Sequence, residues 1–593
     1  MRGRSTRDDI RLNQIGFYPF APKQAFIVGV PSAETFYVLD VAGDTVYSAL
    51  LGAWRSTELS SDSTRLADFS ALSNTGRYVL RVPGLGDSHP FEIRPRAHEL
   101  MARAALKGFY YQRASTALES RFAGEWARDA GHPDTSVLVH ASAATAERPV
   151  GTRVSSPGGW YDAGDYNKYI VNSGITVATL LSLYEDFPEQ VAALDVDIPE
   201  SGDALPDLLD ETLWNVRWML AMQDPDDGGV YHKLTAANFE GFLMPAQARA
   251  QRYVVQKSTA ATLDFAAAMA QASRVLRRLA QEPPDRAEPG RAGEVRTSAT
   301  PQHDVLGPLA DSTLAAARLA WSWARQHADV AYDQRRLNET FDPDIETGTY
   351  GARELDDERI WAAVELFLTT REDSFYTAVP LFPDSAAPLP SWSQVRTLAY
   401  YSLARFRHAL PPPANGDAQR VRDRLIASAD SLVRRATRSA YATPMGGSPD
   451  DFIWGSSAVA ANQGIALITA YRLTGDRTYL LAALANLDYL LGRNATGYSF
   501  VTGYGGKTPR HPHHRPSEAD GVEAPVPGLL VGGPNAGRQD GCDYPFTEPD
   551  RSYVDHVCSY ASNEIAINWN APLVYLASAL EALQFEAGFS VTP

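Results

Sequence analysis

The sequence predicts a mainly α protein in which a small β-sandwich precedes a ring of paired helices. Three observations support this fold class. Residues 8 to about 95 hold short runs of β-branched and aromatic residues separated by Gly, Pro, Asp and Ser. From His98 onward the chain is rich in Ala and Leu, with apolar residues at helical spacing. The chain has 593 residues, which is enough to bury a large core.

The strands of the sandwich are expected where β-branched and aromatic residues cluster between turn residues. The run Asp40-Val41-Ala42-Gly43-Asp44 is a turn signal between two of them. The expected strands are Ala25–Val30, Phe36–Leu39, Thr45–Tyr47 and Tyr78–Val82.

About eleven helices are expected after the sandwich, because amphipathic stretches recur along the rest of the chain. Pro206 falls at the start of one of them, where its missing N–H costs nothing. So many amphipathic helices favour pairs arranged in a ring over a parallel sheet. The expected helices are Leu100–Ser115, Ile175–Glu185, Pro206–Gln223, Thr259–Ala280, Leu306–Gln326, Asp357–Thr369, Trp392–Leu410, Ala418–Ser439, Ala458–Leu473, Arg477–Leu491 and Ile565–Phe585.

Three stretches lack helical spacing. Glu282–His303 is rich in Pro, Arg and Glu, and Pro411–Gly416 is a run of helix breakers, so both are expected to be solvated loops. Thr496–Ser559 has many Gly, Pro and His residues. A stretch that long without regular structure in a compact domain is usually functional.

Composition excludes several classes of function. Lys and Arg total 54 against 71 Asp and Glu, so the net charge is 54 − 71 = −17, which argues against nucleic acid as a partner. No apolar run approaches the ~20 residues that span a membrane, and Met1–Ile10 lacks the apolar segment of a signal peptide. Cys542 and Cys558 are too few for a disulfide scaffold or an all-cysteine zinc site. The sequence leaves open whether these two cysteines form one disulfide or are two reduced thiols.

The segment Gly158–Lys168 contains the first candidate for chemistry. Asp162 and Asp165 lie three positions apart with only Ala and Gly between them, a spacing that points both carboxylates to one side of a turn or helix start. Two carboxylates can hold and deprotonate a water, and aromatic faces pack against sugar rings. A helix N-cap with a solvated turn Asp, or a calcium loop, would explain the same residues without catalysis. The flanking rings are Trp160, Tyr161 and Tyr166.

Glu564 is the second candidate, because it opens an apolar segment rich in large side chains. Partial burial there would raise its pKa and favour a protonated general acid. A Glu that complements a helix N-terminus would have a lowered pKa instead. The residues alone leave both interpretations open.

The run His511-Pro512-His513-His514-Arg515 is the third candidate. A metal normally requires three or four ligands at fixed spacing, and adjacent histidines point apart in an extended chain. Sugar binding is therefore favoured over a metal site, and a solvated polar loop is the remaining option.

Carboxylates at two distant places, aromatic flanks and a His/Arg loop together favour glycoside hydrolysis, which needs one acid and one base or nucleophile. No G-x-S-x-G elbow, P-loop or H-E-x-x-H supports another chemistry. A metal-dependent hydrolase using the His cluster is one alternative. A carbohydrate-binding protein without catalysis is another, although the presence of all three acids speaks against it.

Several local patterns resemble family 9 glycoside hydrolases, the group containing many cellulases, in members with an N-terminal immunoglobulin-like domain. Gly159–Asp165 resembles the catalytic-base segment of that family, and Ser499–Arg515 resembles its histidine signature. The spacing of Tyr553, Asp555 and Glu564 fits its acidic signature. The matching N-terminal segments are Arg11–Phe17 and Asp68–Ser70.

The resemblance implies an (α/α)6 barrel over residues 97–593, after an Ig-like sandwich over 8–96 and a disordered or tag-like start over 1–7. It also implies an inverting mechanism, with Asp165 as general base, Asp162 helping to hold the water and Glu564 as general acid. Asp555 would be a supporting acid. The implied sugar-binding residues are His513, Arg515, Trp160, Tyr161, Tyr166 and Tyr560.

No cofactor is expected to be required. The resemblance implies a calcium site near Asp357 and Glu358, but Ala352 stands where the family has an Asp. A second expected carboxylate is missing near Ser391–Ser393. Because calcium prefers six to eight oxygen ligands, this site is expected to be weak or empty. No zinc site is expected, since both cysteines lie late in the chain.

The expected substrate is a β-1,4-linked glucan, either a cellulose-type polysaccharide or cello-oligosaccharides. An exo-acting β-glucosaminidase or β-glucosidase with the same residues is the alternative, because Tyr110–Thr135 resembles members that act on short oligosaccharides. Endo or exo action and oligomeric state stay open. The resemblance implies a secreted or periplasmic enzyme, while the missing signal peptide leaves the cytoplasm open.

Overall fold

The computed structural model describes residues 6–29, 32–59, 62–281, 300–352 and 354–591. Of the start expected over residues 1–7, residues 1–5 lie outside this range, and Thr6–Asp9 form a short 3-10 helix, η1. Of the loop expected over Glu282–His303, residues 282–299 also lie outside this range, and residues 300–303 belong to the start of helix α7 (Thr300–Gln326) and not to a loop. The chain forms two compact units, which we call the terminal unit (Met1–Gly108 with Leu425–Pro593) and the central unit (Phe109–Arg424). The domain boundaries expected from sequence stay a prediction.

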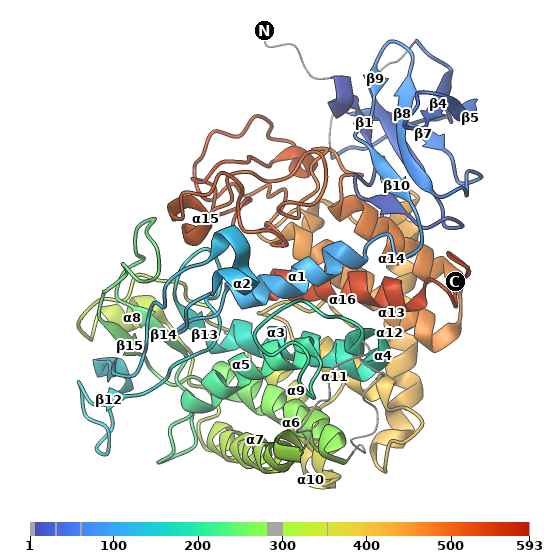
Figure 1. Cartoon of the computed structure of the whole chain (residues 1–593). Coiled ribbons are helices and arrows are strands. Elements are labelled where there is room, and N and C mark those ends of the chain that lie inside the picture. The colour runs from blue at the N-terminus through green and yellow to red at the C-terminus, as the bar shows by residue number, and fades with distance from the viewer. Residues whose placement is uncertain (1–5, 30–31, 60–61, 282–299, 353, 592–593) are drawn as a thin grey trace. The chain divides into compact units, whose positions relative to one another are not determined.

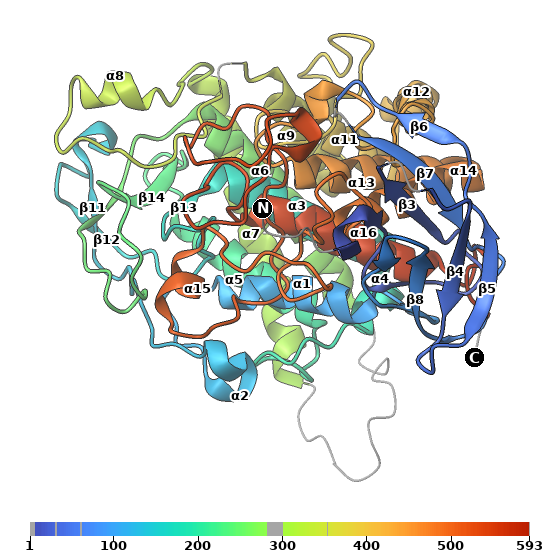
Figure 2. The same cartoon turned by 90° about the horizontal axis from the view of Figure 1, so that it is seen from above.

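The N-terminal β-sandwich consists of two sheets, drawn in blue in Figures 1 and 2. All pairings are antiparallel except β2 with β10. One sheet has the order β1 (Ile10–Arg11), β3 (Gln24–Val28), β7 (Ser63–Asp68) and β6 (Trp54–Ser56). The other has the order β2 (Gly16–Phe17), β10 (Phe91–Ile93), β8 (Gly76–Val82), β4 (Thr35–Leu39) and β5 (Thr45–Leu50), with β9 (Gly86–Asp87) on β8.

The apolar residues that predicted the sandwich form its core. The ring of Phe17 lies edge-on against those of Phe69 and Phe91, at 5.3 and 5.4 Å between centroids. The four expected strands are confirmed as β3, β4, β5 and β8, except that Val30 lies outside the described residues. The strands β6, β7 and β10 were missed because they are short or rich in polar residues.

The terminal unit also holds most of the C-terminal helices. Helix α13 packs against α14 and α16. Two buried hydrogen bonds join the sandwich to these helices: Asn13 Nδ2 to Asp488 Oδ1 in α14 and Tyr18 Oη to Glu581 Oε1 in α16, both 2.8 Å. The helices are α1 (Glu99–Tyr111), α12 (Ala418–Ala436), α13 (Ser456–Thr474), α14 (Arg477–Leu490), α15 (Arg515–Ala519) and α16 (Ile567–Leu583), with α1 and α12 running across the unit boundaries.

The central unit is built around α6, which packs against α3, α7 and α9. The longer helices are α3 (Ile170–Asp186), α5 (Asp207–Ala221), α6 (Thr259–Gln281), α7 (Thr300–Gln326), α9 (Asp356–Thr370) and α11 (Arg396–Arg405). The short helices are α2 (Ser120–Ala123), α4 (Pro188–Ala192), α8 (Gln334–Asn338) and α10 (Asp373–Tyr376).

Two features of the central unit differ from the expectation. A small sheet was not predicted, because its strands have only two to four residues each. The helix expected over Trp392–Leu410 is shorter, because Ser391 and Gln394 pair in a turn that precedes α11. The sheet has the order β12 (Arg153–Val154), β11 (Val137–Val139), β15 (Arg252–Val254), β14 (Lys233–Ala236) and β13 (Lys168–Tyr169).

Candidate active site

The carboxylates Asp162 and Asp165 lie in a loop of the central unit, and the chain just after α1 holds this loop in place. The Tyr161 amide donates to the Gln112 carbonyl (2.8 Å), and Gln112 Nε2 donates to the Ala163 carbonyl (2.8 Å). Gly159 starts the loop at φ +75°, and a Cβ there would lie 2.6 Å from Trp218. Only glycine fits that position.

Asp162 is fully buried and accepts three hydrogen bonds from side chains. Asn172 Nδ2 lies 3.0 Å from Oδ1 and 3.1 Å from Oδ2, and the Tyr350 hydroxyl donates to Oδ2 at 2.9 Å. Burial, followed by the charge of Asp165, raises the pKa of Asp162 to about 8, although these donors favour the ionised form. Asp162 therefore favours its protonated form at neutral pH.

Asp165 is also buried, but its partners differ from those of Asp162. Its Oδ2 accepts from the Asn167 side chain and from the Asn167 backbone amide (3.3 Å). The Tyr169 hydroxyl lies 3.4 Å from the same oxygen. Burial and the charges of Asp165 and Asp162 hold the pKa of Tyr169 well above its usual range, so this hydroxyl stays a donor.

The rings flanking the carboxylates are buried. Trp160, Tyr161 and Tyr166 lie in the core of the central unit. The Tyr161 hydroxyl pairs with His132 Nδ1 at 2.9 Å, and Tyr166 donates to the Leu243 carbonyl at 2.6 Å. These contacts hold the carboxylate loop against the core of the central unit. The expected stacking of these rings on sugars stays a prediction.

The β14–β15 loop, residues 237–251, is tied to the carboxylate loop and carries two exposed rings. Its Leu243 carbonyl is the acceptor for Tyr166, and Glu240 pairs with His132 at 3.4 Å. Phe239 and Phe242, in contrast, are 48% and 44% exposed. Exposed aromatic faces are suited to packing against sugar rings.

Glu564 lies in the terminal unit, half-buried in a short β-bridge with His513. The His513 amide donates to the Asn563 carbonyl (2.9 Å), and the Gly532 amide donates to the Glu564 carbonyl (2.9 Å). Helix α16 begins at Ile567, so Glu564 is not in its first turn.

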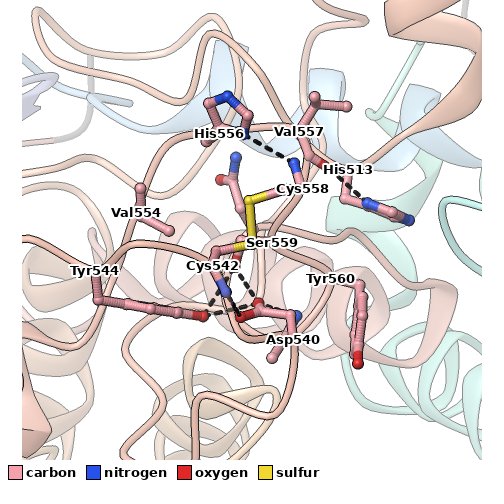
Figure 3. Close-up of a disulfide and its surroundings, with 12 residues drawn as sticks. His513, Asp540, Cys542, Tyr544, Val554, His556, Val557, Cys558, Ser559 and Tyr560 are labelled. Atoms are coloured by element: carbon pink, nitrogen blue, oxygen red, sulfur yellow. Dashed lines mark hydrogen bonds between the residues drawn. A yellow bond between two sulfur atoms is a disulfide. The ribbon is translucent and has the colours of Figure 1, made fainter.

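The histidine loop is organised by Asp555 (Figure 3 shows part of it). The Asp555 carboxylate accepts from the Arg510 amide (2.8 Å) and the His511 amide (2.9 Å). The His513 ring contacts the Val557 carbonyl through Nδ1 at 2.6 Å. A carbonyl can only accept, so His513 Nδ1 carries a proton and donates it to Val557.

Arg515 and Tyr560 belong to the same part of the terminal unit. Arg515 is buried at the start of α15. The Tyr560 ring lies 6.0 Å from the His513 ring and 5.4 Å from Trp454 between centroids, and Trp454 is 42% exposed. These rings form an aromatic row beside Glu564.

The structure thus assembles the predicted residues in two sets. The central unit holds Asp162 and Asp165 in one loop, together with the buried rings of Trp160, Tyr161 and Tyr166. The terminal unit holds the other set, which comprises Glu564, Asp555, His513, Arg515 and Tyr560.

Three residues of these sets were missed from sequence. Asn172 lies at the start of α3 among mainly apolar residues. A polar side chain in such a position is a signal that the sequence offers. Tyr350 lies far from Asp162 in the sequence, and it adopts the left-handed region at φ +45° while bonding Asp162. Trp454 follows Phe452 and Ile453 in a short apolar run, which resembles core sequence.

The residues expected to hold calcium fit that ion poorly. Asp357 Oδ2 already accepts from the Val395 amide at 2.7 Å. Glu358 and Asp264 are buried, and no donor among the described residues lies at hydrogen-bonding distance and angle from their carboxylate oxygens. Burial raises the pKa of both groups, so a cation would have to displace protons from them. Within the described ranges, no group of three or more His, Cys, Asp or Glu side chains is placed to hold a metal.

Comparison with known proteins defines the class of protein to which these two sets belong. Residues 99–577 match the model of glycosyl hydrolase family 9, and residues 5–87 match that of the cellulase N-terminal ig-like domain. The chain is 44% identical to a xyloglucan-specific endo-beta-1,4-glucanase of Bacteroides ovatus, over 97% of this chain and 94% of that protein. It is 32% identical to endoglucanase D of Acetivibrio thermocellus, over 95% and 82%.

A solved structure of a Bacteroides ovatus family 9 enzyme superposes with a TM-score of 0.88 at 42% identity, covering 97% of this chain and 99% of that one. The chain therefore belongs to glycosyl hydrolase family 9. The predicted fold class, an (α/α)6 barrel after an Ig-like sandwich, is confirmed, as is the class of enzyme, a glycoside hydrolase of the cellulase type. Its substrate is a β-linked glycan. None of the helices in the described residues has the length and apolar character needed to cross a membrane.

Proposed function

We propose that this enzyme cleaves β-1,4 linkages within glucan chains with inversion at the anomeric carbon. The observation that carries the proposal is the Asp162–Asp165 pair, two buried carboxyl groups in one loop that together can hold and deprotonate a water. Relatives named endoglucanases support endo action. The 44% relative makes xyloglucan the first polymer to test.

In this proposal Asp165 takes a proton from the attacking water while Asp162 orients that water. The water oxygen bonds to the anomeric carbon, the glycosidic bond breaks, and Glu564 gives its proton to the leaving oxygen. Inverting enzymes hold their two carboxyl groups far enough apart for a water to fit between base and sugar. His513 and Arg515 bind the sugar next to the scissile bond, and Asp555 supports their loop through the Arg510 and His511 amides.

Two measurements test the mechanism. Glu564→Gln and Asp165→Asn should each lower kcat by about 10²–10⁴-fold, the range for loss of a general acid or base, with cellopentaose binding retained. Proton NMR of early products should show the α-anomer. Full activity in either variant, or a first product with the β-configuration, would contradict the assignment.

A second candidate is trimming of short chains, which a 31% identical cellodextrinase of Butyrivibrio fibrisolvens supports. Product profiles on xyloglucan, carboxymethylcellulose and cellopentaose separate the two. A rapid fall in polymer viscosity indicates endo action, whereas steady release of one short product indicates trimming.

We also propose that no cofactor is required, because Asp357 is already hydrogen-bonded and two carboxylates of the family site are missing. Treatment with EDTA, followed by excess calcium, should leave the thermal midpoint and the activity unchanged. A rise of several degrees with calcium would contradict this proposal.

We place the enzyme outside the cytoplasm, as the family resemblance implies. Cys542 and Cys558 form a disulfide, and such bonds persist mainly in oxidising compartments. Alkylation of the unfolded, unreduced protein should label no thiol, and two labelled thiols would favour a reducing compartment.

A further inference from the structure

The Cys542–Cys558 disulfide lies directly beside the residues that we propose bind sugar (Figure 3). It joins the segment 540–544 to the segment 554–560, and neither segment contains a helix or strand. No backbone ladder therefore fixes the position of the second segment, which leads to Glu564. A covalent link between two irregular segments restrains both of them.

The second segment determines how His513 is oriented. The carbonyl that accepts the His513 Nδ1 proton belongs to Val557, the residue immediately before Cys558. The Cys558 amide itself donates to the His556 ring at 3.0 Å. The disulfide thus restrains the peptide unit that accepts from His513 Nδ1 and sets the direction of its ring.

A polar clamp beside the disulfide holds the same two segments. Asp540 Oδ2 accepts from Tyr544 (2.8 Å), Ser559 (2.6 Å) and the Ala561 amide (3.0 Å). Burial alone would raise the pKa of Asp540, but these hydrogen bonds lower it, so the clamp is ionised at neutral pH. Because the clamp does not depend on the disulfide, removing the disulfide should loosen the Val557 carbonyl without unfolding the loop.

We propose that the Cys542–Cys558 disulfide positions the Val557 carbonyl, which fixes the orientation of the His513 ring for sugar binding, and that the oxidised enzyme is the fully competent form. The inference rests on the sugar-binding role of His513 proposed above. Reduction is a two-electron step: one dithiol reagent attacks a sulfur, the S–S bond breaks, and two protein thiols and the cyclic disulfide of the reagent result. Cys558 is exposed, so a small reductant can reach the bond.

The test compares oxidised enzyme, enzyme reduced by dithiothreitol and the variant Cys542→Ser/Cys558→Ser. Both altered forms should raise KM for cellopentaose by about 3- to 10-fold, the effect of weakening one hydrogen bond, with a smaller change in kcat and a retained thermal transition. The double variant is its own control, because these are the only two cysteines and dithiothreitol should not affect it further. If the variant does not fold, the reduced wild-type enzyme provides the same comparison.

Removing the disulfide in a His513→Ala background distinguishes an effect that acts through His513 from a general structural effect. If the disulfide acts through His513, its loss should have little further effect on KM there, because the two changes act on one interaction. An equal loss in both backgrounds, or unchanged KM in the double variant, overturns the proposal. The affinity for cellopentaose, measured by calorimetry, separates failure of this proposal from failure of the proposed function. Binding can weaken on reduction even if the protein does not cleave glucan.

Discussion

At the scale of single residues, the buried proton on Asp162 has a measurable consequence. Its pKa in the folded protein, about 8, lies above its ordinary value of 3.8. The folded state therefore binds this proton more tightly, and the contribution to stability is full below about pH 4 and is lost as pH rises toward 8. Asp162→Asn cannot ionise, so the variant should gain stability relative to wild type as pH rises.

This prediction is checked with thermal midpoints of both proteins between pH 4 and pH 9. The variant loses part of the hydrogen bonding to Asn172, and this loss shifts its thermal midpoint by the same amount at every pH. The informative quantity is thus the difference between the two proteins at each pH. A difference that does not change with pH would show that Asp162 is ionised throughout.

Tyr350→Phe isolates one donor to the same carboxylate. The change removes the 2.9 Å hydrogen bond to Asp162, which is worth about 0.5–1.5 kcal/mol, and should lower kcat/KM by about 3- to 10-fold. The matched control is Tyr376→Phe, which removes a 2.8 Å bond to Asp417 in the same unit. Equal losses of activity in the two variants would show that Tyr350 has no special role at the carboxylates.

At the scale of elements, the loop between β14 and β15 is expected to contribute sugar-binding surface. Phe239→Ala/Phe242→Ala should raise KM for cellohexaose and xyloglucan by about 10-fold or more, because each aromatic contact is worth roughly 0.5–1.5 kcal/mol, while kcat changes less. Phe20→Ala, at a ring 51% exposed in the sandwich, is the control. An unchanged KM in the double variant would leave these rings without a substrate role.

The sequence predicted elements well where they are long and regular, and poorly where they are short. The spacing of Asp162 and Asp165 was sufficient to predict that both carboxylates lie in one loop. It could not reveal Tyr350, which approaches Asp162 from 188 positions away and depends on packing of the whole central unit. For the same reason the five-stranded sheet was missed: its strands are too short for a pattern and are defined by their partners.

At the scale of the whole molecule, the sandwich is bonded to distant helices of its own unit through buried polar groups. Asn13 donates to Asp488 and accepts from the amides of Ile15 and Gly16. Burial raises the pKa of Asp488 to about 6, although Arg493 favours its charged form. Asn13→Ala should therefore cost about 1–3 kcal/mol of unfolding free energy, since buried groups lose their partners.

Urea denaturation checks this expectation. Asp40→Ala removes a turn carboxylate of the same sandwich whose bonds to Ala42 and Asp44 are exposed, and it should cost less. Similar losses in both variants would mean that the polar link to the helices adds nothing to the stability of the unit.

The discontinuity of the terminal unit has a consequence for the order in which the protein matures. Ribosomes produce the sandwich first, yet two of its buried partners, Asp488 and Glu581, emerge last. The central unit is contiguous and is complete after residue 424, so it can fold while the sandwich still waits for its final contacts. Until α14 is released Asn13 lacks its bond to Asp488, and until the last helix, α16, is released Tyr18 lacks its bond to Glu581. A nascent chain halted before α16 should accordingly be more sensitive to protease in its first hundred residues than in its middle.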